Sequence, residues 1–332
     1  LVINTIAGTP TVGGTSGDGG PATAAMLSAP SDVTVDFNGN IYIVDSLKSQ
    51  VRKVDSNTGI ITTIAGTGEF GYAGDGGPAL QAKFYYPKGI AVDQAGNILV
   101  ADSLNGRVRR IDANTSIVTT VAGTGEFAFD AEDQNGDGSL ATSARITTPE
   151  DIAFDKNGNM YIADISNYRV RKVDALTGVI STVAGNGEAG FNGDGGPARS
   201  ASLVPYSIAV DDTGSIFVAD PTNYRVRRVD VATALISTVA GNGAQGYSGD
   251  QGAATAAMLN WPKNIAFDQR GNLLIVDQDN NCVRKVGKSG VISTLIGTGQ
   301  SGYFGDGGPA ALAKLNRPAG LAVFNYGIYV AD

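Results

Sequence analysis

The chain has 332 residues, with 46 glycines, one cysteine and no histidine. A single cysteine excludes an intrachain disulfide, and the absence of histidine removes the commonest general base and transition-metal ligand. Lys and Arg number 24 against 32 Asp and Glu, a net charge of −8. A polyanion is repelled by that charge unless a local basic face exists. No apolar run approaches the length of a membrane span. We expect neither nucleic-acid binding nor direct insertion into a membrane.

The N-terminal stretch 1–8, LVINTIAG, reads as the tail of a repeating unit. Its TIAG motif, or a close variant, starts at residues 5, 63, 120, 182, 238 and 294. The period is therefore 56 to 62 residues. A unit of that length is too long for a solenoid rung and is typical of a propeller blade with one long loop.

Within the second unit we predict four strands, over residues 89–93, 97–102, 107–112 and 117–123. Asp93 and Gly96 give the first connection hairpin-turn chemistry. The first two strands and their turn, 87–102, recur at 30–45, 149–164, 205–220, 262–277 and 318–332. Four antiparallel strands joined by hairpins make a sheet that must pack on its neighbours, and radial closure protects its edges.

A long loop containing G-D-G-G-P-A at 74–79 links each unit to the next. Pro78 followed by ALQAKF predicts one or two helical turns. Strand parity places these loops on one face of the ring, together with the connections between the second and third strands. The two kinds of hairpin turn are expected on the opposite face.

The unit P-x-x-I-A-V-D-x-x-G-N-I-Y-V-A-D-x-x-N-x-R-V resembles the NHL repeat, most clearly at 149–170 and 205–226. The resemblance covers nearly the whole chain and implies a six-bladed β-propeller. The G-D-G-G-P-A loops look like those of secreted and cell-surface members of the family. That family includes ligand-binding, protein-binding, sensor and RNA-binding propellers and a few lyases, so fold membership does not choose a function. Ser49-Gln50, Cys282 and Phe324 depart from the pattern.

We therefore predict an all-β, six-bladed propeller with four-stranded antiparallel blades, in one domain over residues 1–332. The blade repeats are expected at about 30–66, 87–123, 149–185, 205–241, 262–297 and 318–332 plus 1–8. Residues 1–8 should close the last blade, which then lacks one strand. We expect a segment like N-x-R-V-R-K-V to follow in a longer protein; the alternative is that another molecule donates the strand.

A candidate calcium loop lies at 133–138, where D-Q-N-G-D-G fits the start of the D-x-N-x-D-G pattern. Asp133, Asn135 and Asp137 place oxygen ligands at alternate positions, and Asp130 adds a nearby carboxylate. The twelfth position holds Ala144 instead of the glutamate that completes such loops. Two interpretations stay open: a Ca²⁺ site, or an acidic solvated loop extension.

Two further groups of oxygen-bearing side chains are candidates for sites. The loop aspartates Asp18, Asp75, Asp194, Asp250 and Asp306 look like a cation crown, but we favour a structural role in accepting backbone N–H groups. At the channel mouth, Asp32, Asp151 and Asn264 fall on alternate blades. These three are possible ligands of a central hard cation or polar molecule, although variation at a wet channel mouth explains them more simply.

The remaining motifs favour structural roles. The loop aromatics Tyr72, Phe191, Tyr247 and Tyr303 are expected to pack their loops onto a blade. The R-V-R-R and R-V-R-K runs should alternate faces and pair with strand carboxylates. Cys282 replaces an arginine and is expected to be a small buried or half-buried substitute. Asn114 begins the sequon N-T-S, a possible glycosylation site if the chain is secreted by a eukaryote.

We predict a non-catalytic extracellular or cell-surface binding or structural module, with Ca²⁺ as its candidate stabilising ion. Its partner is a protein or a glycan, or another copy of the chain in a surface assembly or filament. The alternative is a calcium-dependent hydrolase or lactonase that uses a carboxylate-only central site.

Overall fold

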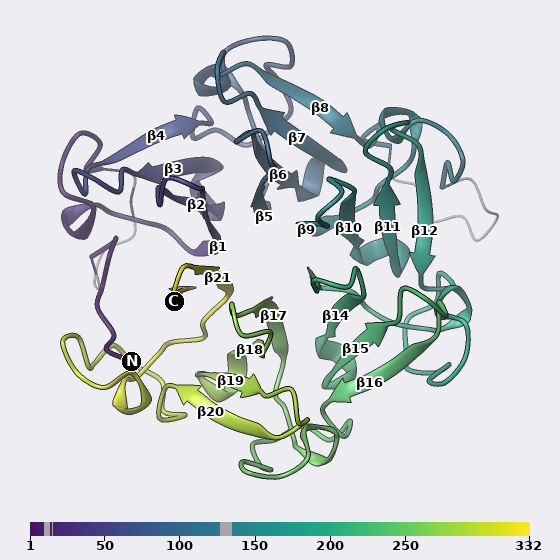
Figure 1. Ribbon diagram of the computed structural model, residues 1–332. Helices are drawn as coiled ribbons and strands as arrows, with labels where there is room; N and C mark the ends of the chain where they lie inside the picture. Colours follow the sequence, from purple (N-terminus) through teal and green to yellow (C-terminus); the bar gives the residue numbers. More distant parts are fainter. Residues whose placement is uncertain (10–13, 15, 127–134) are drawn as a thin grey trace.

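Four-stranded antiparallel sheets stand around a common axis in the computed structural model, which describes residues 1–9, 14, 16–126 and 135–332 (Figure 1). In each complete blade the strands follow one another from the axis outward. Blade 1 consists of β1 (Pro30–Val35), β2 (Ile41–Asp45), β3 (Gln50–Val54) and β4 (Ile61–Ala65). Blade 2 consists of β5 (Pro87–Val92), β6 (Ile98–Asp102), β7 (Arg107–Ile111) and β8 (Val118–Ala122).

The next three blades repeat this order. Blade 3 consists of β9 (Pro149–Phe154), β10 (Met160–Asp164), β11 (Arg169–Val173) and β12 (Ile180–Ala184). Blade 4 consists of β13 (Ser207–Val210), β14 (Ile216–Asp220), β15 (Arg225–Val229) and β16 (Ile236–Ala240). Blade 5 consists of β17 (Pro262–Phe267), β18 (Leu273–Asp277), β19 (Cys282–Val286) and β20 (Ile292–Ile296).

The prediction of a six-bladed propeller is wrong, because the structure has five four-stranded blades. The last sheet contains only β21 (Gly320–Phe324) and β22 (Gly327–Ala331). Residues 1–8, predicted to close the last blade as its outer strand, form no strand ladder: Val2 makes an isolated bridge to Pro309, and Ile3 bonds to Gly307 and Gly308 of the adjoining loop. The physical reason is that a strand needs a ladder partner, and no described strand lies between β22 and this N-terminal segment.

One-turn 3₁₀ helices occur in two places. One set follows the second strand of each complete blade: η2 (Ser46–Lys48), η4 (Ser103–Asn105), η6 (Ile165–Asn167), η8 (Pro221–Asn223) and η10 (Gln278–Asn280). The other set lies in the long loops: η1 (Ala22–Ala24), η3 (Ala79–Gln81), η5 (Ala141–Ser143), η7 (Ala198–Ser200), η9 (Ala254–Ala256) and η11 (Ala310–Leu312). The helical turn predicted after Pro78 is thus confirmed as η3.

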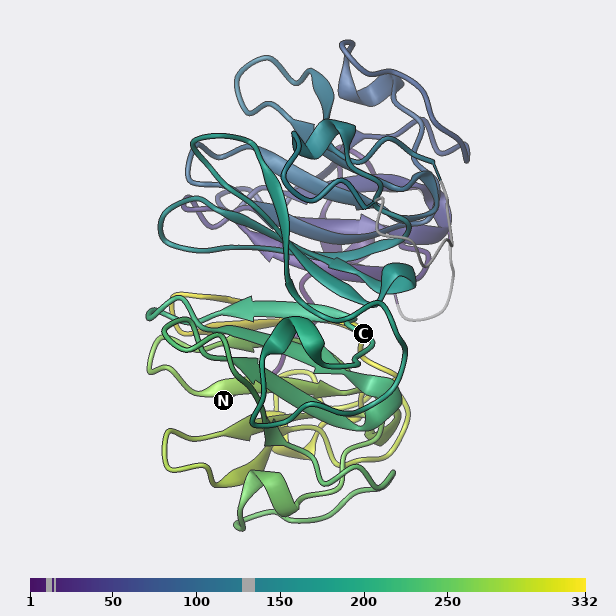
Figure 2. The ribbon, with the colours of Figure 1, turned by 90° about the vertical axis from the view of Figure 1, so that its right-hand side faces the viewer.

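The hydrophobic core is divided among the gaps between neighbouring sheets. All five residues of each of the second strands β2, β6, β10, β14 and β18 are buried. Their side chains alternate between the two faces, so each strand packs on both neighbours. Ile162 of blade 3, for example, packs in one cluster with Leu99 and Val108 of blade 2. Figure 2 shows the sheets stacked in this way when the ring is turned onto its side.

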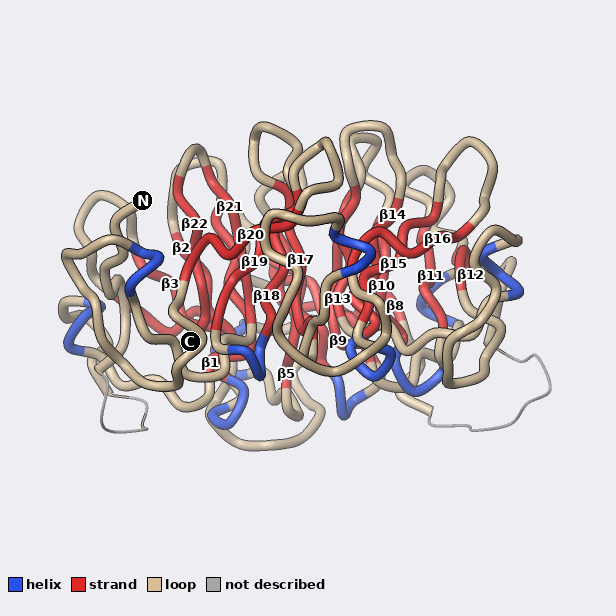
Figure 3. Tube along the Cα trace, turned by 90° about the horizontal axis from the view of Figure 1, so that it is seen from below, coloured by secondary structure: helices blue, strands red, loops and turns tan. Residues whose placement is uncertain are grey.

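The glycine of the repeated T-x-A-G motif is required by geometry. Gly123 has φ +91°, in the left-handed region, and a Cβ placed on it would overlap the carbonyl oxygen of Gly106. Glycine has no Cβ, so it adopts this φ without strain and does not overlap that oxygen. In the edge-on view of Figure 3 the hairpin loops rise on one side of the ring. Across the described residues, each helix is a single short turn that could not cross a bilayer.

Candidate functional site

The strands nearest the axis begin around a cavity of about 270 Å³, here called the channel mouth. Asp32, Asp151 and Asn264, predicted as a set from the sequence, all line it, together with the charged side chains of Lys88, Glu150 and Lys263. The three predicted residues are buried, so their polar atoms need partners.

Backbone N–H groups of the next blade supply those partners for the two acids. Ile90 N donates to Asp32 Oδ2 at 3.0 Å, and Ile208 N donates to Asp151 Oδ2 at 2.9 Å. Ser207 has the same role in blade 4, where its Oγ accepts Ile265 N at 3.2 Å. These side chains therefore hold adjacent blades together at the axis.

Glycine at the intervening positions makes room for the acids. A Cβ on Gly89 would lie 2.7 Å from Asp151 Cα, and one on Gly320 would lie 2.5 Å from Asp32 Cα. Because Gly320 has no side chain, Asn264 Nδ2 reaches Asp32 Oδ1 at 3.5 Å. Acidic side chains and glycines therefore alternate from blade to blade because each acid needs the space that a glycine leaves beside it.

Charges at the channel mouth are mixed and close together. Lys263 Nζ lies 2.9 Å from Glu150 Oε1 and 4.6 Å from the ring centre of Tyr206. Burial and then the neighbouring charge of Asp151 raise the pKa of Asp32 well above its ordinary value. Burial also raises the pKa of Asp151 to about 6. Burial lowers the pKa of Lys88.

Tyr86 and Tyr206 line the channel mouth, and three further rings contact them. We call the five side chains together the aromatic rim: Phe70, Tyr85, Tyr86, Tyr206 and Trp261. Phe70 stacks on Tyr86 with ring centres 4.9 Å apart, and Tyr85 lies 5.7 Å from Phe70. Tyr206 and Trp261 meet edge to face at 5.6 Å. Phe70 is 47% exposed and Tyr85 is 38% exposed, so part of the rim faces solvent.

Sequence reasoning missed the rim and the three charged residues beside it. Tyr86 and Trp261 directly precede the proline that starts an inner strand, and Lys88, Glu150 and Lys263 directly follow one. Tyr86 and Trp261 have φ of +48° and +59°, which is costly for bulky side chains. The available signal was that the residues flanking this repeated proline differ from blade to blade.

A buried arginine in the third strand of each complete blade was predicted to pair with strand carboxylates, and ion pairs confirm this. Arg109 lies 3.3 Å from Asp102 Oδ2, at the end of β6, and 2.5 Å from Asp75 Oδ1, in the long loop. The corresponding arginines Arg52, Arg171, Arg227 and Arg284 are also fully buried and bind their own loop aspartates. The loop aspartates therefore have the structural role that we favoured.

The same aspartates anchor each long loop to the outer strand of the following blade. Thr120 N donates to Asp75 Oδ2 at 3.1 Å, and Thr63, Thr182, Thr238 and Thr294 donate in the same way. Tyr72 Oη also donates to Asp75, at 3.0 Å, while its ring lies 3.8 Å from the Arg107 guanidinium. The expected packing of this loop aromatic is thereby confirmed.

The calcium loop stays a prediction. Asp130 and Asp133 lie outside the described residues. The Asn135 carbonyl accepts Arg171 Nη2 at 2.9 Å, and Asp137 Oδ1 lies 2.7 Å from the same nitrogen. Thr182 N donates to the other oxygen of Asp137 at 2.9 Å. Asp137 thus already serves the arginine network, and among the described residues no three acidic, histidine or cysteine side chains are grouped to hold a metal.

Two smaller predictions concern single residues. Cys282 is fully buried, which confirms its expected role as a small buried substitute, and burial raises the pKa of its thiol. Asn114 is exposed in the hairpin turn between β7 and β8. Its glycosylation stays a prediction.

Comparison with known proteins supports the resemblance of the repeats to the NHL repeat. The family model for the Teneurin NHL domain matches residues 4–72, 68–131, 117–192 and 242–303. Protein SUPPRESSOR OF QUENCHING 1, chloroplastic, from Arabidopsis thaliana is 27% identical over 319 residues, covering 92% of this chain and 29% of that protein. Teneurin-1 from Mus musculus is 31% identical over 240 residues, covering 64% of this chain and 8% of that protein.

An auxiliary nutrient binding protein from Bacteroides thetaiotaomicron has a similar solved structure. Its TM-score is 0.69 at 15% sequence identity, covering 99% of this chain and 73% of that one. At that identity the likeness shows the fold alone. This chain spans less than a third of either relative in sequence. The family model covers more than half of the chain, so the chain belongs to the family of the teneurin NHL domain, a β-propeller built from NHL repeats.

Proposed function

We propose that this chain is a non-catalytic, extracellular protein-binding module and that the aromatic rim is its contact surface. The observation that carries the proposal is the cluster of Phe70, Tyr85 and Tyr86, whose rings lie 4.9 to 5.7 Å apart beside the channel mouth. Rigid, partly exposed aromatic side chains are enriched at the energetic centres of protein interfaces. The lysines and Glu150 nearby can supply the polar border of such a surface.

The enzymatic alternative is less well supported by the channel mouth. A carboxylate-only site needs an acid that is free to bind a metal or accept a proton. Asp32 and Asp151 each accept a backbone N–H from the next blade, and both are buried. The chain has no histidine to replace them. Matches to Teneurin-1 and to a nutrient-binding fold support binding, although the chloroplastic relative leaves the location to be tested.

The test compares the wild type with the double variant Phe70→Ser, Tyr85→Ser in a screen of displayed extracellular protein domains and a glycan array. We expect protein partners that bind the wild type and lose at least tenfold in affinity for the variant, as two interface aromatics imply. Leu176→Ser is the matched control, because Leu176 is 96% exposed in a hairpin turn remote from the rim. Equal binding by all three proteins would contradict the proposal.

Two further measurements test the other parts of the proposal. Hydrolysis of chromogenic esters and lactones, measured with and without Ca²⁺, is expected to show no turnover that depends on Asp151. Turnover abolished by Asp151→Asn would favour the enzyme. Antibody labelling of intact cells is expected to detect the chain, and labelling that requires permeabilisation would contradict an extracellular location.

A further inference from the structure

In blades 2, 3 and 4 the third strand begins with a half-buried arginine, two positions before the fully buried one. Arg107 Nη1 donates to Asn105 O at 2.8 Å, and its Nη2 donates to Thr124 O. Arg169 and Arg225 bind the equivalent pairs of backbone carbonyl oxygens at 2.9 to 3.3 Å. Each of these three blades thus holds the guanidinium group of its own arginine in a clamp of two carbonyl oxygens.

An aromatic ring and a glycine complete the clamp. The Tyr72 ring lies 3.8 Å from the Arg107 guanidinium, and the Phe191 ring lies 3.7 Å from the Arg225 guanidinium. A Cβ on Gly125 would overlap the guanidinium of Arg107, so glycine leaves the space that the cation fills. A planar cation that donates in two directions and stacks on a ring suits such a site.

Blade 5 has Cys282 in place of this arginine. Cys282 pairs with the last residue of β18, as Arg107 pairs with the last residue of β6. The cysteine side chain is fully buried and has a single heavy atom beyond Cβ. It therefore does not reach the position that the guanidinium occupies in the other blades.

The carbonyl oxygens and the glycine of the clamp are nevertheless present in blade 5. The two oxygens belong to Asn280 and Thr298, and no described side chain donates to either of them. A Cβ on Gly299 would have only the Asn280 oxygen within 4 Å, at 3.6 Å, apart from its chain neighbours. The space beside this glycine is therefore open.

The loop aromatic of the clamp is also in place. The Tyr247 ring lies 4.8 Å from the buried arginine of blade 5, as the Tyr72 ring lies 4.9 Å from that of blade 2. Tyr247 Oη lies 2.7 Å from Thr294 Oγ1, which fixes the ring, and the residue is 50% exposed. The two carbonyl oxygens, Gly299 and Tyr247 are here called the open clamp.

The charges around the open clamp lack one cation. In blade 5 Arg284 alone lies beside two acids, Asp250 at 2.6 Å and Asp277 at 3.3 Å. Burial, and after it the charge of Asp277, raise the pKa of the Cys282 thiol, so this position lies in a negative field. A cation placed in the clamp is therefore attracted.

Other described side chains do not fill the open clamp. Blade 1 also lacks the arginine, but there Gln50 takes its place, with Nε2 3.4 Å from Gly66 O and 3.5 Å from a Cβ on Gly68. Arg317, on the loop beside blade 5, is paired with Asp279 at 3.0 Å and does not donate to the clamp. The opening is thus specific to blade 5, whose four strands are all present.

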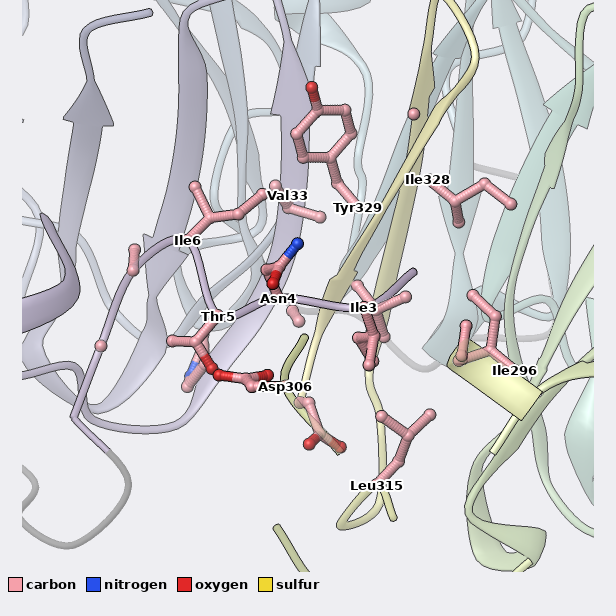
Figure 4. A pocket seen from close by; sticks show the side chains of 18 of the residues that line it. Ile3, Asn4, Thr5, Ile6, Val33, Ile296, Asp306, Leu315, Ile328 and Tyr329 are labelled. Atoms are coloured by element: carbon pink, nitrogen blue, oxygen red, sulfur yellow. The ribbon is translucent and has the colours of Figure 1, made fainter. Parts of the chain in front are cut away.

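The open clamp is separate from two cavities of the ring. The larger, of about 500 Å³, lies between residues 1–9 and β22, with Ile3 on one side and Tyr329 on the other (Figure 4). The other is the channel mouth. Neither is lined by the groups of the open clamp. Binding at the clamp can therefore be tested without changing the aromatic rim.

We propose that the open clamp of blade 5 binds the guanidinium group of an arginine side chain that belongs to a partner protein. The proposal rests on the proposed function only in assigning the arginine to a protein. Trp261 of the aromatic rim and Tyr247 lie in the same loop, between β16 and β17, so one partner can contact both. The guanidinium donates to the two carbonyl oxygens and stacks on the ring, as Arg107 does within blade 2.

The test follows the amide resonances of the ¹⁵N-labelled chain by NMR while N-acetylarginine amide is added. Saturable shifts are expected at Tyr247, Asn281 and Gly299, with a dissociation constant on the order of 1 mM, since a single side chain binds. N-acetylcitrulline amide is the matched control, because it has the same shape without the charge. It should bind about tenfold more weakly, and so should N-acetyllysine amide, whose ammonium cannot span both oxygens.

Changes in the protein locate the site. Cys282→Arg supplies the guanidinium from within, as in the other blades, and should abolish the shifts, whereas Cys282→Ala should bind like the wild type. Arg225→Cys opens the same clamp in blade 4 and should add a second set of shifts, at Gly243. Tyr247→Leu should weaken binding about two- to fivefold through the loss of stacking.

Three results would each overturn the proposal: no saturable shift at the open clamp, equal affinity for the citrulline compound, or shifts that persist in Cys282→Arg. Free arginine that binds at least tenfold more tightly than N-acetylarginine amide would indicate a free amino acid as the ligand. That result would overturn the assignment to a protein.

A failure of the clamp can be told apart from a failure of the aromatic rim. The double variant Phe70→Ser, Tyr85→Ser should bind N-acetylarginine amide like the wild type. A protein partner that binds the rim should lose about tenfold in affinity for Cys282→Arg, because its arginine is displaced. Equal affinity of such a partner for Cys282→Arg and the wild type would overturn the clamp and leave the rim unaffected.

Discussion

Replacing Arg109 with methionine removes the cation from a fully buried ion-pair network. Arg109 contacts the half-buried Asp75 at 2.5 Å and the fully buried Asp102 at 3.3 Å. It also donates to the carbonyl oxygens of Ala73 and Lys83 at 3.2 and 3.4 Å. Methionine has a similar length but no donors, so the main effect is electrostatic. Breaking a buried pair from one side costs about 3–5 kcal/mol.

The pKa of Asp102 sets an upper limit to that cost and makes it depend on pH. Without Arg109, the buried Asp102 can take up a proton and so avoid an unpaired charge. Burial raises the pKa of Asp102 to about 6 even with Arg109 beside it. Protonating Asp102 from that value costs about 1.4 kcal/mol at pH 7 and almost nothing at pH 5. The acceptors that Arg109 leaves unpaired cost about 1–3 kcal/mol at either pH. We therefore expect Arg109→Met to lower the free energy of unfolding by about 2–4 kcal/mol at pH 7 and by about 1–3 kcal/mol at pH 5.

Guanidinium chloride unfolding, followed by circular dichroism at both pH values, measures this cost. The double variant Arg109→Met, Asp102→Asn should recover about 1 kcal/mol of the loss at pH 7, because the acid that has to be protonated is gone. Arg110→Met is the matched control: Arg110 lies half-buried on the other face of β7, and we expect an effect below about 1 kcal/mol. A cost below about 1 kcal/mol for Arg109→Met, or one that neither pH nor Asp102→Asn changes, would refute the reasoning.

Three further predictions concern the axis and the predicted calcium loop. Since burial raises the pKa of Asp151 to about 6, this residue stabilises the fold most below pH 3.8, and the stabilisation is lost as the pH rises through 6. Asp151→Asn should therefore remove up to about 3 kcal/mol of the fall in the free energy of unfolding between pH 4 and 8. An unchanged dependence of unfolding on pH would contradict this. Gly89→Ala should cost about 1–3 kcal/mol in chemical unfolding because its Cβ overlaps Asp151; a neutral effect would show that the blades can separate there. Calorimetry with Ca²⁺ should give a binding heat that Asp133→Ala abolishes, and equal heats for the two proteins would end the calcium prediction.

Local pattern was sufficient to predict the strands and turns of this protein. Asp93 caps its hairpin turn by accepting N–H groups from Ala95 and Asn97, as its position in the turn implied. Strand alternation also implied that the third-strand arginines pair with carboxylates. These features depend on residues close in sequence or on a period that repeats along the chain.

Contacts between blades could not be predicted in the same way. The Asp32 carboxylate accepts Ile90 N, 58 positions away, and the reason for Gly89 appears only when Asp151 lies beside it. The prediction of six blades failed for a related reason. Residues 1–8 have the sequence of an outer strand, but a strand is defined by its ladder partners, and β22 does not reach them.

Hydrogen exchange of the chain alone, resolved to single amides, tests most directly the claim that β22 pairs with β21 alone among the described strands. Slow exchange is expected throughout β6, which has a hydrogen-bonded neighbour on each side. In β22, alternate amides should exchange as fast as those of exposed loops, and residues 3–7 should have amides that behave in the same way. Uniformly slow exchange in both segments, matching β6 and β8, would contradict the claim.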